Sequence, residues 1–394
     1  MTVHIVADRA PFAPRSNVPA LLVLEDGSVF RGRSIGAAGT VFGEAVFNTG
    51  MAGYQEVLTD PSYRRQIVTM TAPHVGNYGL NEADMESDRI QVAGFVVREA
   101  ARRPSNWRSQ HDLRDSLAEA GVVGIEGIDT RRLTRLLRDK GAMRAGLSTE
   151  ILDADALHAQ VLDSPGMQGA ELASEVTTRE PFVLPAAGER RFRVVALDFG
   201  MKRSIGRYLR EQGAEVHVLP ASATPDQVRE RDPDGLFLSN GPGDPATVSQ
   251  GIATTAALLG EVPTFGICLG SQLLGHALGA TTYKLDFGHH GVNQPVLRRS
   301  DGMVEITSHN HGFAVRGSTL GEQADEHVFT TRDHGRVEVS HVNLNDDVVE
   351  GLTALDIPAF SVQYHPEAAP GPTDARYLFA RFTDLIQEVR GATA

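Results

Sequence analysis

The stretch FGICLGSQLLG, residues Phe265–Gly275, is the part of this 394-residue chain that most directly predicts its fold. It contains Cys268, the only cysteine, immediately after the apolar run VPTFGI and immediately before a helical pattern. Gly266 and Gly270 stand two residues to either side, which is the spacing of a nucleophile elbow between a strand and a helix. Such a turn presents the thiol at the carboxyl edge of a sheet, where open α/β folds bind ligands. The alternative is a glycine-rich packing turn around a buried, inert thiol.

Short apolar runs alternate with helical patterns on both sides of this stretch. RVVALDF, AEVHVLP and GLFLSN predict strands before it, each followed by a predicted helix, and AFSVQYH (359–365) predicts the last core strand. Runs of this kind indicate a parallel sheet covered by helices on both faces. After Tyr283, a higher content of Val, Thr and His predicts antiparallel additions. We therefore expect an α/β fold with a doubly wound, mostly parallel C-terminal sheet, closed by a helix in TDARYLFARFTDLIQEVR.

The first half of the chain has a different pattern. LLVLEDGSVFRGRSIG (21–36) predicts a hairpin that turns at Asp26-Gly27, and DTRRLTRLLRDKG (129–141) predicts a helix that stops at Gly141. REPFVLPAAGERR, with its prolines and charges, predicts a linker. We expect a separate mixed α/β N-terminal domain, with these bounds along the chain: flexible tail 1–18, N-terminal domain 19–178, linker 179–191 and C-terminal domain 192–390.

Composition excludes several classes of protein. Hydrophobic residues are 41% and charged residues 22%, as in globular soluble proteins, and the net charge of −13 argues against a nucleic-acid surface. No apolar run approaches the roughly 18 residues of a membrane span, and the N-terminus lacks the basic region of a signal peptide. One cysteine excludes an intramolecular disulfide and fits a reducing compartment. We expect a cytoplasmic protein without nucleic-acid or membrane partners.

A thiol nucleophile needs a base, and SVQYHPEAAP contains the best candidate among the 14 histidines. His365 and Glu367 are two residues apart at the predicted end of a strand, so we expect their side chains to leave on one face. A carboxylate beside an imidazole fixes its tautomer and stabilises its cation. Taken alone, the pair is better explained as a satisfied surface contact, but the elbow in the same domain reverses that preference and favours a nucleophile, base and orienting carboxylate.

The stretch SNGPGDP, Ser239–Pro245, follows a predicted strand and lacks the spacing and the lysine of a P-loop. Gly241 and Gly243 can expose bare N–H groups beside the elbow, where an oxyanion hole needs donors. The N–H of Leu269, directly after the cysteine, is the natural second donor. Taken alone, GPG would be an ordinary turn.

Two histidine pairs invite a metal interpretation, at 289–290 and at His309 with His311. No cysteine or carboxylate stands at ligand spacing near them, and isolated histidine pairs usually serve polar networks. We therefore expect no metal site.

Taken in order, SNGPGDP, FGICLGSQLLG, SHNHGF and QYHPE resemble the class I, triad-type glutamine amidotransferase domain over about residues 193–389. The resemblance implies that Cys268 is the nucleophile, His365 the base and Glu367 its orienting group. It also implies hydrolysis of glutamine through a thioester, with release of ammonia. The lack of a C-G-x-C-W context around the cysteine argues against a papain-like protease.

The first half narrows the family. The segments at 47–79 and 121–147, together with KLDFGHHGVNQPV (284–296), are similar to the small chain of glutamine-hydrolysing carbamoyl-phosphate synthetase. That family often has a serine where this chain has Gly50, so a hydroxyl is absent there. The positions that the resemblance implies for binding L-glutamine are Gly50, Gly241, Gly243, Leu269, Gln272, Asn310, Gly312 and Phe313.

The resemblance also implies a partner. A separate large subunit would use ATP and Mg to join the ammonia to bicarbonate for arginine and pyrimidine biosynthesis, and this chain would hold no cofactor itself. Two alternatives remain: a glutaminase that serves another synthase, such as anthranilate or GMP synthesis, and a catalytically silent scaffolding subunit. The extra N-terminal region argues against the first alternative, and the intact set of Cys268, His365 and Glu367 argues against the second.

Overall fold

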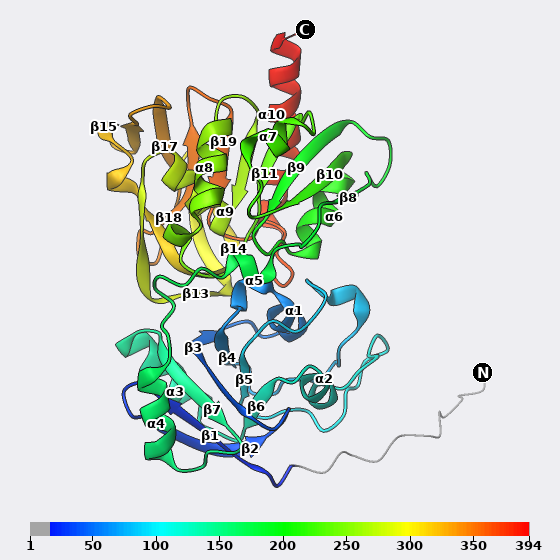
Figure 1. Cartoon of the computed structure of the whole chain (residues 1–394), viewed down its shortest axis with the longest axis vertical. Coiled ribbons are helices and arrows are strands. Elements are labelled where there is room, and N and C mark those ends of the chain that lie inside the picture. Colours follow the sequence, from blue (N-terminus) through cyan, green and yellow to red (C-terminus); the bar gives the residue numbers. More distant parts are fainter. Residues whose placement is uncertain (1–15, 394) are drawn as a thin grey trace, which may run out of the picture.

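The computed structural model describes residues 16–393, so most of the predicted tail at 1–18 lies outside the described residues. The described chain divides between two sheets, one built by the first half and one by the second (Figure 1). None of the helices within residues 16–393 has the combination of length and apolar composition that crossing a membrane requires. The mixed α/β architecture with a separate N-terminal part agrees with the sequence-based expectation.

The N-terminal sheet is a closed barrel of seven strands. The predicted hairpin is confirmed, because its two strands pair antiparallel around the turn at Asp26-Gly27. The predicted helix is also confirmed: the Asp129 side chain caps its first turn, and it ends at Gly141. The strands are β1 (Pro19–Leu24), β2 (Val29–Ser34), β3 (Thr40–Asn48), β4 (Gln66–Met70), β5 (Gly94–Val97), β6 (Val123–Glu126) and β7 (Met143–Ser148), and the helices are α1 (Tyr54–Thr59), α2 (Leu113–Glu119), α3 (Thr130–Lys140), α4 (Ala154–Asp163) and α5 (Ala173–Val176).

The second sheet contains the parallel core that the sequence predicts. Its core strands lie in the order β19-β12-β11-β9-β10 and are mutually parallel. Their bounds are β9 (Phe192–Asp198), β10 (Ala214–Pro220), β11 (Gly235–Leu238), β12 (Thr264–Ile267) and β19 (Ala359–Val362), and the helices are α6 (Arg203–Glu211), α7 (Pro225–Arg229), α8 (Ser249–Leu258), α9 (Leu269–Ala277) and α10 (Tyr377–Thr393).

Both faces of this core are covered by helices. Residues of α6 and α10 such as Leu209 and Phe382 pack with Phe265 on one face. Residues of α8 and α9 such as Leu258 and Leu273 fill the other face. Alternate residues of β9 and β11 enter opposite clusters, so these strands are buried on both sides, and this burial explains their continuous apolar runs. β10, next to the edge strand, keeps Glu215 and His217 partly exposed on one side.

Antiparallel strands extend the sheet on the β19 side, as expected. They are β13 (Thr281–Arg298), β14 (Val304–Arg316), β15 (Glu322–Asp325), β16 (Val328–Thr330), β17 (Arg336–Asn343) and β18 (Val349–Ala354). On the opposite edge, the segment predicted as a linker at 179–191 contains β8 (Phe182–Leu184), which pairs antiparallel with β10. Its side chains are exposed or half-buried, so this strand lacks the apolar pattern by which the core strands were found.

The barrel contacts the second sheet through the turn Pro61–Tyr63 and its neighbours. Asn310 Nδ2 donates to Asp60 Oδ2 over 2.8 Å, and Asn240 Nδ2 donates to Ser62 Oγ over 2.9 Å. Farther along, the Ser204 hydroxyl donates to the buried Glu86 carboxylate over 2.6 Å. These buried bonds hold the barrel against the carboxyl ends of the parallel strands.

Candidate active site

Cys268 occupies the turn between β12 and α9. Its backbone has φ 55° and ψ −106°, a conformation that non-glycine residues rarely adopt and that is found mainly where function requires it. The neighbouring backbone approaches too closely for side chains: a Cβ on Gly270 would lie 2.1 Å from the Leu238 carbonyl oxygen, and one on Gly266 would lie 2.6 Å from that of Gly270. The flanking glycines therefore allow the tight packing of the elbow that holds the thiol at the sheet edge.

His365 and Glu367 lie beyond the strand rather than in it. β19 ends at Val362, so the expectation that the two side chains leave one face of a strand is wrong. The chain turns instead, because the His365 N–H donates to the Ser308 carbonyl of a different strand over 2.8 Å. The turn still joins the pair: His365 Nδ1 lies 2.7 Å from Glu367 Oε1, and both side chains are buried.

Lys202, which sequence reasoning missed, completes this group. Its ammonium lies 3.0 Å from Glu367 Oε1 and donates to the carbonyl oxygens of Ala368 and Ala369 over 2.7 and 3.0 Å. All three N–H donors are therefore used inside the protein. No local pattern marks this lysine, because its partner is 165 residues away in the sequence.

Burial and charge act in opposite directions on these groups. Burial raises the pKa of Glu367, but Lys202 and His365 outweigh it and lower the pKa to about 2. Burial lowers the pKa of His365, but the Glu367 carboxylate and Cys268 outweigh it and raise the pKa to about 10. The site therefore favours an imidazolium next to an ionised carboxylate at neutral pH. His365 Nε2 is buried and makes no hydrogen bond among the described residues.

Two backbone donors lie beside the thiol. The N–H groups of Leu269 and Gly241 donate no hydrogen bond within the described part of the chain. A Cβ on Gly241 would lie 2.2 Å from the Phe199 carbonyl oxygen and 2.8 Å from the Leu269 side chain, so only glycine fits where the two loops meet. Both N–H groups are thus without an acceptor inside the described part of the chain.

A small pocket lies in front of Cys268. Seven of the residues singled out in the sequence line it: Gly241, Gly243, Cys268, Gln272, Asn310, Gly312 and Phe313. Leu269, His365, Glu367 and Gly50 are not among its lining residues. Sequence reasoning assigned no role to the other lining residues, Glu44, Ser62, Gln66, Met167, Pro242, His290 and His311. Several of these come from the barrel, so the pocket is built by both halves of the chain.

The side chains of Gln272 and Asn310 are partly committed to the protein. Gln272 Nε2 donates to the Phe313 carbonyl over 2.7 Å and to Gln363 Oε1 over 3.0 Å, which leaves its own oxygen as an acceptor. Asn310 donates to Asp60, and its Oδ1 lies 2.9 Å from His290 Nδ1. Burial lowers the pKa of His290 to about 3, so this imidazole is neutral at pH 7.

Gly50 supports the site from the barrel without lining the pocket. Its N–H donates to Asn48 Oδ1 over 2.7 Å, and Asn48 Nδ2 donates to the buried Tyr63 hydroxyl over 2.8 Å. The adjacent Thr49 N–H donates to the His290 carbonyl over 3.3 Å. The contacts of Gly50 and Thr49 described here are made by backbone N–H groups, so they do not require a side chain at position 50.

Next to the pocket, His289, His309 and His311 converge with Glu350 of β18. The expectation that no carboxylate accompanies these histidines is wrong. Glu350 is distant in sequence, but the order β14-β13-β17-β18 brings its side chain to the cluster. Burial lowers the pKa values of His309 and His311 well below the usual histidine value, so both rings are neutral at pH 7.

Two protein-family models match this chain, one in each half. The model of the carbamoyl-phosphate synthase small chain, CPSase domain, matches residues 22–147, and that of the class-I glutamine amidotransferases matches residues 195–385. The carbamoyl phosphate synthase small chain of Streptomyces coelicolor is 57% identical over 375 residues, covering 94% of this chain and 97% of the relative. That of Thermotoga maritima is 50% identical over 390 residues, covering 94% and 99%. The chain therefore belongs to the family of carbamoyl phosphate synthase small chains, with a class-I glutamine amidotransferase domain in its second half.

Proposed function

We propose that this chain is the glutaminase subunit of a carbamoyl-phosphate synthase, which hydrolyses L-glutamine to glutamate and ammonia. The observation that carries the proposal is a set of neighbouring groups: a thiol on a strained elbow that lines the pocket, the buried pair of His365 and Glu367, whose imidazole interacts with Cys268, and two free backbone N–H groups. This arrangement contains a nucleophile, a proton carrier with its orienting group, and an oxyanion hole, as acyl transfer requires.

In the first half of the reaction, the Cys268 thiolate attacks the side-chain carboxamide carbon of glutamine and forms a C–S bond. The carbonyl oxygen becomes an oxyanion, which accepts hydrogen bonds from the N–H groups of Leu269 and Gly241. As the intermediate collapses, the C–N bond breaks and the imidazolium of His365 gives its Nε2 proton to the leaving nitrogen. Ammonia departs, and a thioester remains on Cys268.

In the second half, water attacks the thioester carbon while His365 Nε2, now neutral, accepts a proton from it. The C–S bond breaks, glutamate leaves, and the thiolate is restored beside the imidazolium. Glu367 holds the ring through Nδ1 in both halves, and Lys202 keeps Glu367 ionised. Lys202 is thus a positioning residue, since it acts through Glu367 and not on the substrate.

Recognition of glutamine follows from the groups that remain free in the pocket. The carbonyl oxygen of Gln272 is an acceptor suited to the α-ammonium group, because the N–H groups of this side chain are already used. The backbone at Gly241, Gly243 and Gly312 leaves room for the substrate, and Phe313 forms one wall. We assign Gly50 an indirect role, through Asn48 and the contact of Thr49 with His290.

The ammonia is proposed to pass to a separate large subunit, where it is joined to bicarbonate with consumption of ATP. ATP and Mg²⁺ then belong to that partner, and the product serves arginine and pyrimidine biosynthesis in the cytoplasm. The relatives support this assembly through their shared description as small chains. Three barrel residues, Glu44, Ser62 and Gln66, line the pocket. A glutaminase that serves another synthase would not need this barrel, so the barrel argues against that alternative.

The decisive experiment replaces the nucleophile in the assembled complex. Cys268→Ser is expected to abolish carbamoyl phosphate synthesis from glutamine while synthesis from added ammonium continues, because only the glutaminase step uses the thiol. His365→Asn should behave in the same way, and His276→Asn, on the opposite end of α9, serves as a matched control that retains both activities. Loss of both activities in Cys268→Ser would assign the thiol a structural role. A glutaminase assay with and without the large subunit, in which mixing should raise the rate strongly, tests the partner.

A further inference from the structure

The four side chains beside the pocket are arranged as a metal-binding site. His289 comes from β13, His309 and His311 from one face of β14, and Glu350 from β18. All four residues are buried, and one ligand atom from each lies within 4.8 Å of the others. Such a convergence of three imidazoles and a carboxylate, taken from three different strands, differs from the isolated pairs that the sequence displays.

Three of the distances between the ligand atoms are close to those of tetrahedral coordination. His309 Nδ1 lies 3.1 Å from His311 Nε2 and 3.6 Å from Glu350 Oε1, and His289 Nδ1 lies 3.4 Å from the same oxygen. Ligands bound to zinc at about 2.1 Å in a tetrahedron are about 3.4 Å apart. Side-chain rotations that move atoms by about 1 Å would close the longest separation to that value.

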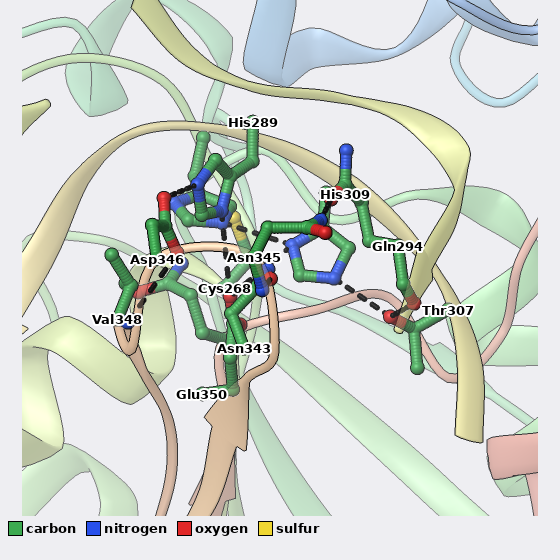
Figure 2. Close-up of polar contacts among 12 residues, drawn as sticks. Cys268, His289, Gln294, Thr307, His309, Asn343, Asn345, Asp346, Val348 and Glu350 are labelled. Carbon is green, nitrogen blue, oxygen red and sulfur yellow. Dashed lines mark hydrogen bonds and ion pairs between the residues drawn. The ribbon is translucent and has the colours of Figure 1, made fainter. Parts of the chain in front are cut away.

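Each of the four side chains also contacts an outer polar group, as metal ligands usually do. Figure 2 shows two of these contacts, His289 with Asp346 and His309 with Thr307. His311 Nδ1 lies 2.9 Å from the Phe313 carbonyl oxygen, and Asn343 Nδ2 donates to Glu350 Oε1 over 3.1 Å.

The positions of the protons leave lone pairs directed at one another. In one proton arrangement that fits these contacts, the Thr307 hydroxyl donates to the Gln294 carbonyl and accepts from His309 Nε2–H, with the lone pair of His309 on Nδ1. His311 uses Nδ1–H for the Phe313 carbonyl, so its lone pair is on Nε2. In this arrangement the two lone pairs face each other over 3.1 Å, and a bound cation would accept both.

Two further buried atoms of these residues, His289 Nδ1 and Glu350 Oε2, make no hydrogen bond among the described residues. His289 Nδ1 has only an ion-pair contact, 3.4 Å from Glu350 Oε1. Unsatisfied buried polar atoms cost free energy, and a cation bound at this point would take the lone pair of His289 Nδ1. The negative charge of Glu350 and the outer carboxylate of Asp346 would balance a divalent ion.

We propose that His289, His309, His311 and Glu350 bind a Zn²⁺ ion that serves a structural role. Imidazole nitrogens exclude Mg²⁺ and Ca²⁺, which prefer oxygen ligands, and the tetrahedral spacing favours zinc. Four protein ligands leave no open position for water, so the ion takes no part in hydrolysis. It fixes β14 on both sides of Asn310, whose carbonyl oxygen accepts from the Cys268 thiol over 3.6 Å.

The test uses the full chain, stripped with a strong chelator and titrated with ZnCl₂ against a chromogenic competitor. We expect one equivalent of zinc to bind and to raise the midpoint of thermal unfolding. Co²⁺ should replace zinc and give the intense visible absorption of a tetrahedral site. Cys268→Ser should bind zinc as the unchanged protein does, which separates the metal ligands from the thiol.

Substitutions of the proposed ligands test whether zinc binds at this cluster. His309→Gln and Glu350→Gln should each lose stoichiometric binding, whereas the control His276→Gln, which lies outside the cluster, should retain it. Asp346→Asn should weaken binding by about 10–100-fold, as changes to outer partners do. Absence of zinc uptake by the unchanged, folded protein would overturn the proposal by itself. Full retention of zinc by both ligand variants, or its loss in Cys268→Ser, would also overturn it.

Discussion

The substitution Lys202→Met removes the charge that accompanies Glu367 and leaves a methyl-ended chain of similar length. Both side chains are buried, with 3% of the lysine and 0% of the glutamate exposed. The variant therefore leaves a carboxylate inside the protein without its cation. It also deprives the carbonyl oxygens of Ala368 and Ala369 of their donor.

The expected loss of stability can be worked out in two ways. Breaking a buried ion pair by removing one partner costs about 3–5 kcal/mol. The lowering of the Glu367 pKa from 4.5 to about 2 corresponds to about 3 kcal/mol, at about 1.4 kcal/mol for each pKa unit. Lys202 and His365 share that effect, so we expect Lys202→Met to lower the free energy of unfolding by about 3 kcal/mol at pH 7.

The loss of stability caused by Lys202→Met depends on pH in a defined direction. Because folding lowers the pKa of Glu367, its stabilising contribution is complete above pH 4.5 and is lost as the pH falls toward 2. The difference in stability between the unchanged protein and Lys202→Met should therefore shrink over that window. His365 behaves in the opposite way: its raised pKa means that its contribution is complete below about pH 6.5 and is lost as the pH rises toward 10.

Urea unfolding followed by far-UV circular dichroism measures the loss, and Lys140→Met is the matched control. Lys140 pairs with Asp26 while 58% exposed, so the same substitution should cost at most about 1 kcal/mol there. Adding Glu367→Gln to Lys202→Met should recover part of the stability, because it removes the unpaired charge. Equal unfolding free energies for Lys202→Met and Lys140→Met at pH 7 would refute the reasoning.

Three further substitutions test the roles assigned to Glu367, Gly241 and Gly50. Glu367→Gln should lower the glutaminase kcat less than His365→Asn does, because the carboxylate orients the ring without exchanging protons with the substrate; an equal loss would assign it a larger role. Gly241→Ala should lower kcat by about 10²–10³-fold by displacing an oxyanion donor, since its Cβ would lie 2.2 Å from a carbonyl oxygen; unchanged steady-state kinetics would remove Gly241 from the oxyanion hole. Gly50→Ser should leave the glutamine KM unchanged, because Gly50 does not line the pocket and its Cβ would meet the Asn48 oxygen at 2.9 Å, the Ala52 carbonyl at 3.2 Å and Val292 at 3.9 Å; a several-fold rise would show a pocket shaped around glycine.

Much of the fold was predictable because its signals are local. The central parallel strands carry apolar runs, since they are buried on both faces, and α3 has a capping aspartate and a terminal glycine at its ends. The short strand β8 escaped prediction because it lies at an exposed edge, between prolines and charges, where no apolar pattern is needed. The end of β19 was misjudged because a hydrogen bond from His365 to Ser308, in another strand, turns the chain away.

The sequence by itself determined the elbow at Cys268, the glycines that it needs and the pairing of His365 with Glu367, because residues a few positions apart build each of these features. Only the tertiary structure decided which charges surround them. Lys202 reaches Glu367, and Glu350 reaches the histidines, through the order of strands in a sheet. These partners pair because the fold brings them close together and because a buried charge without a partner costs free energy. Neither cause produces a regular spacing of residues in the sequence.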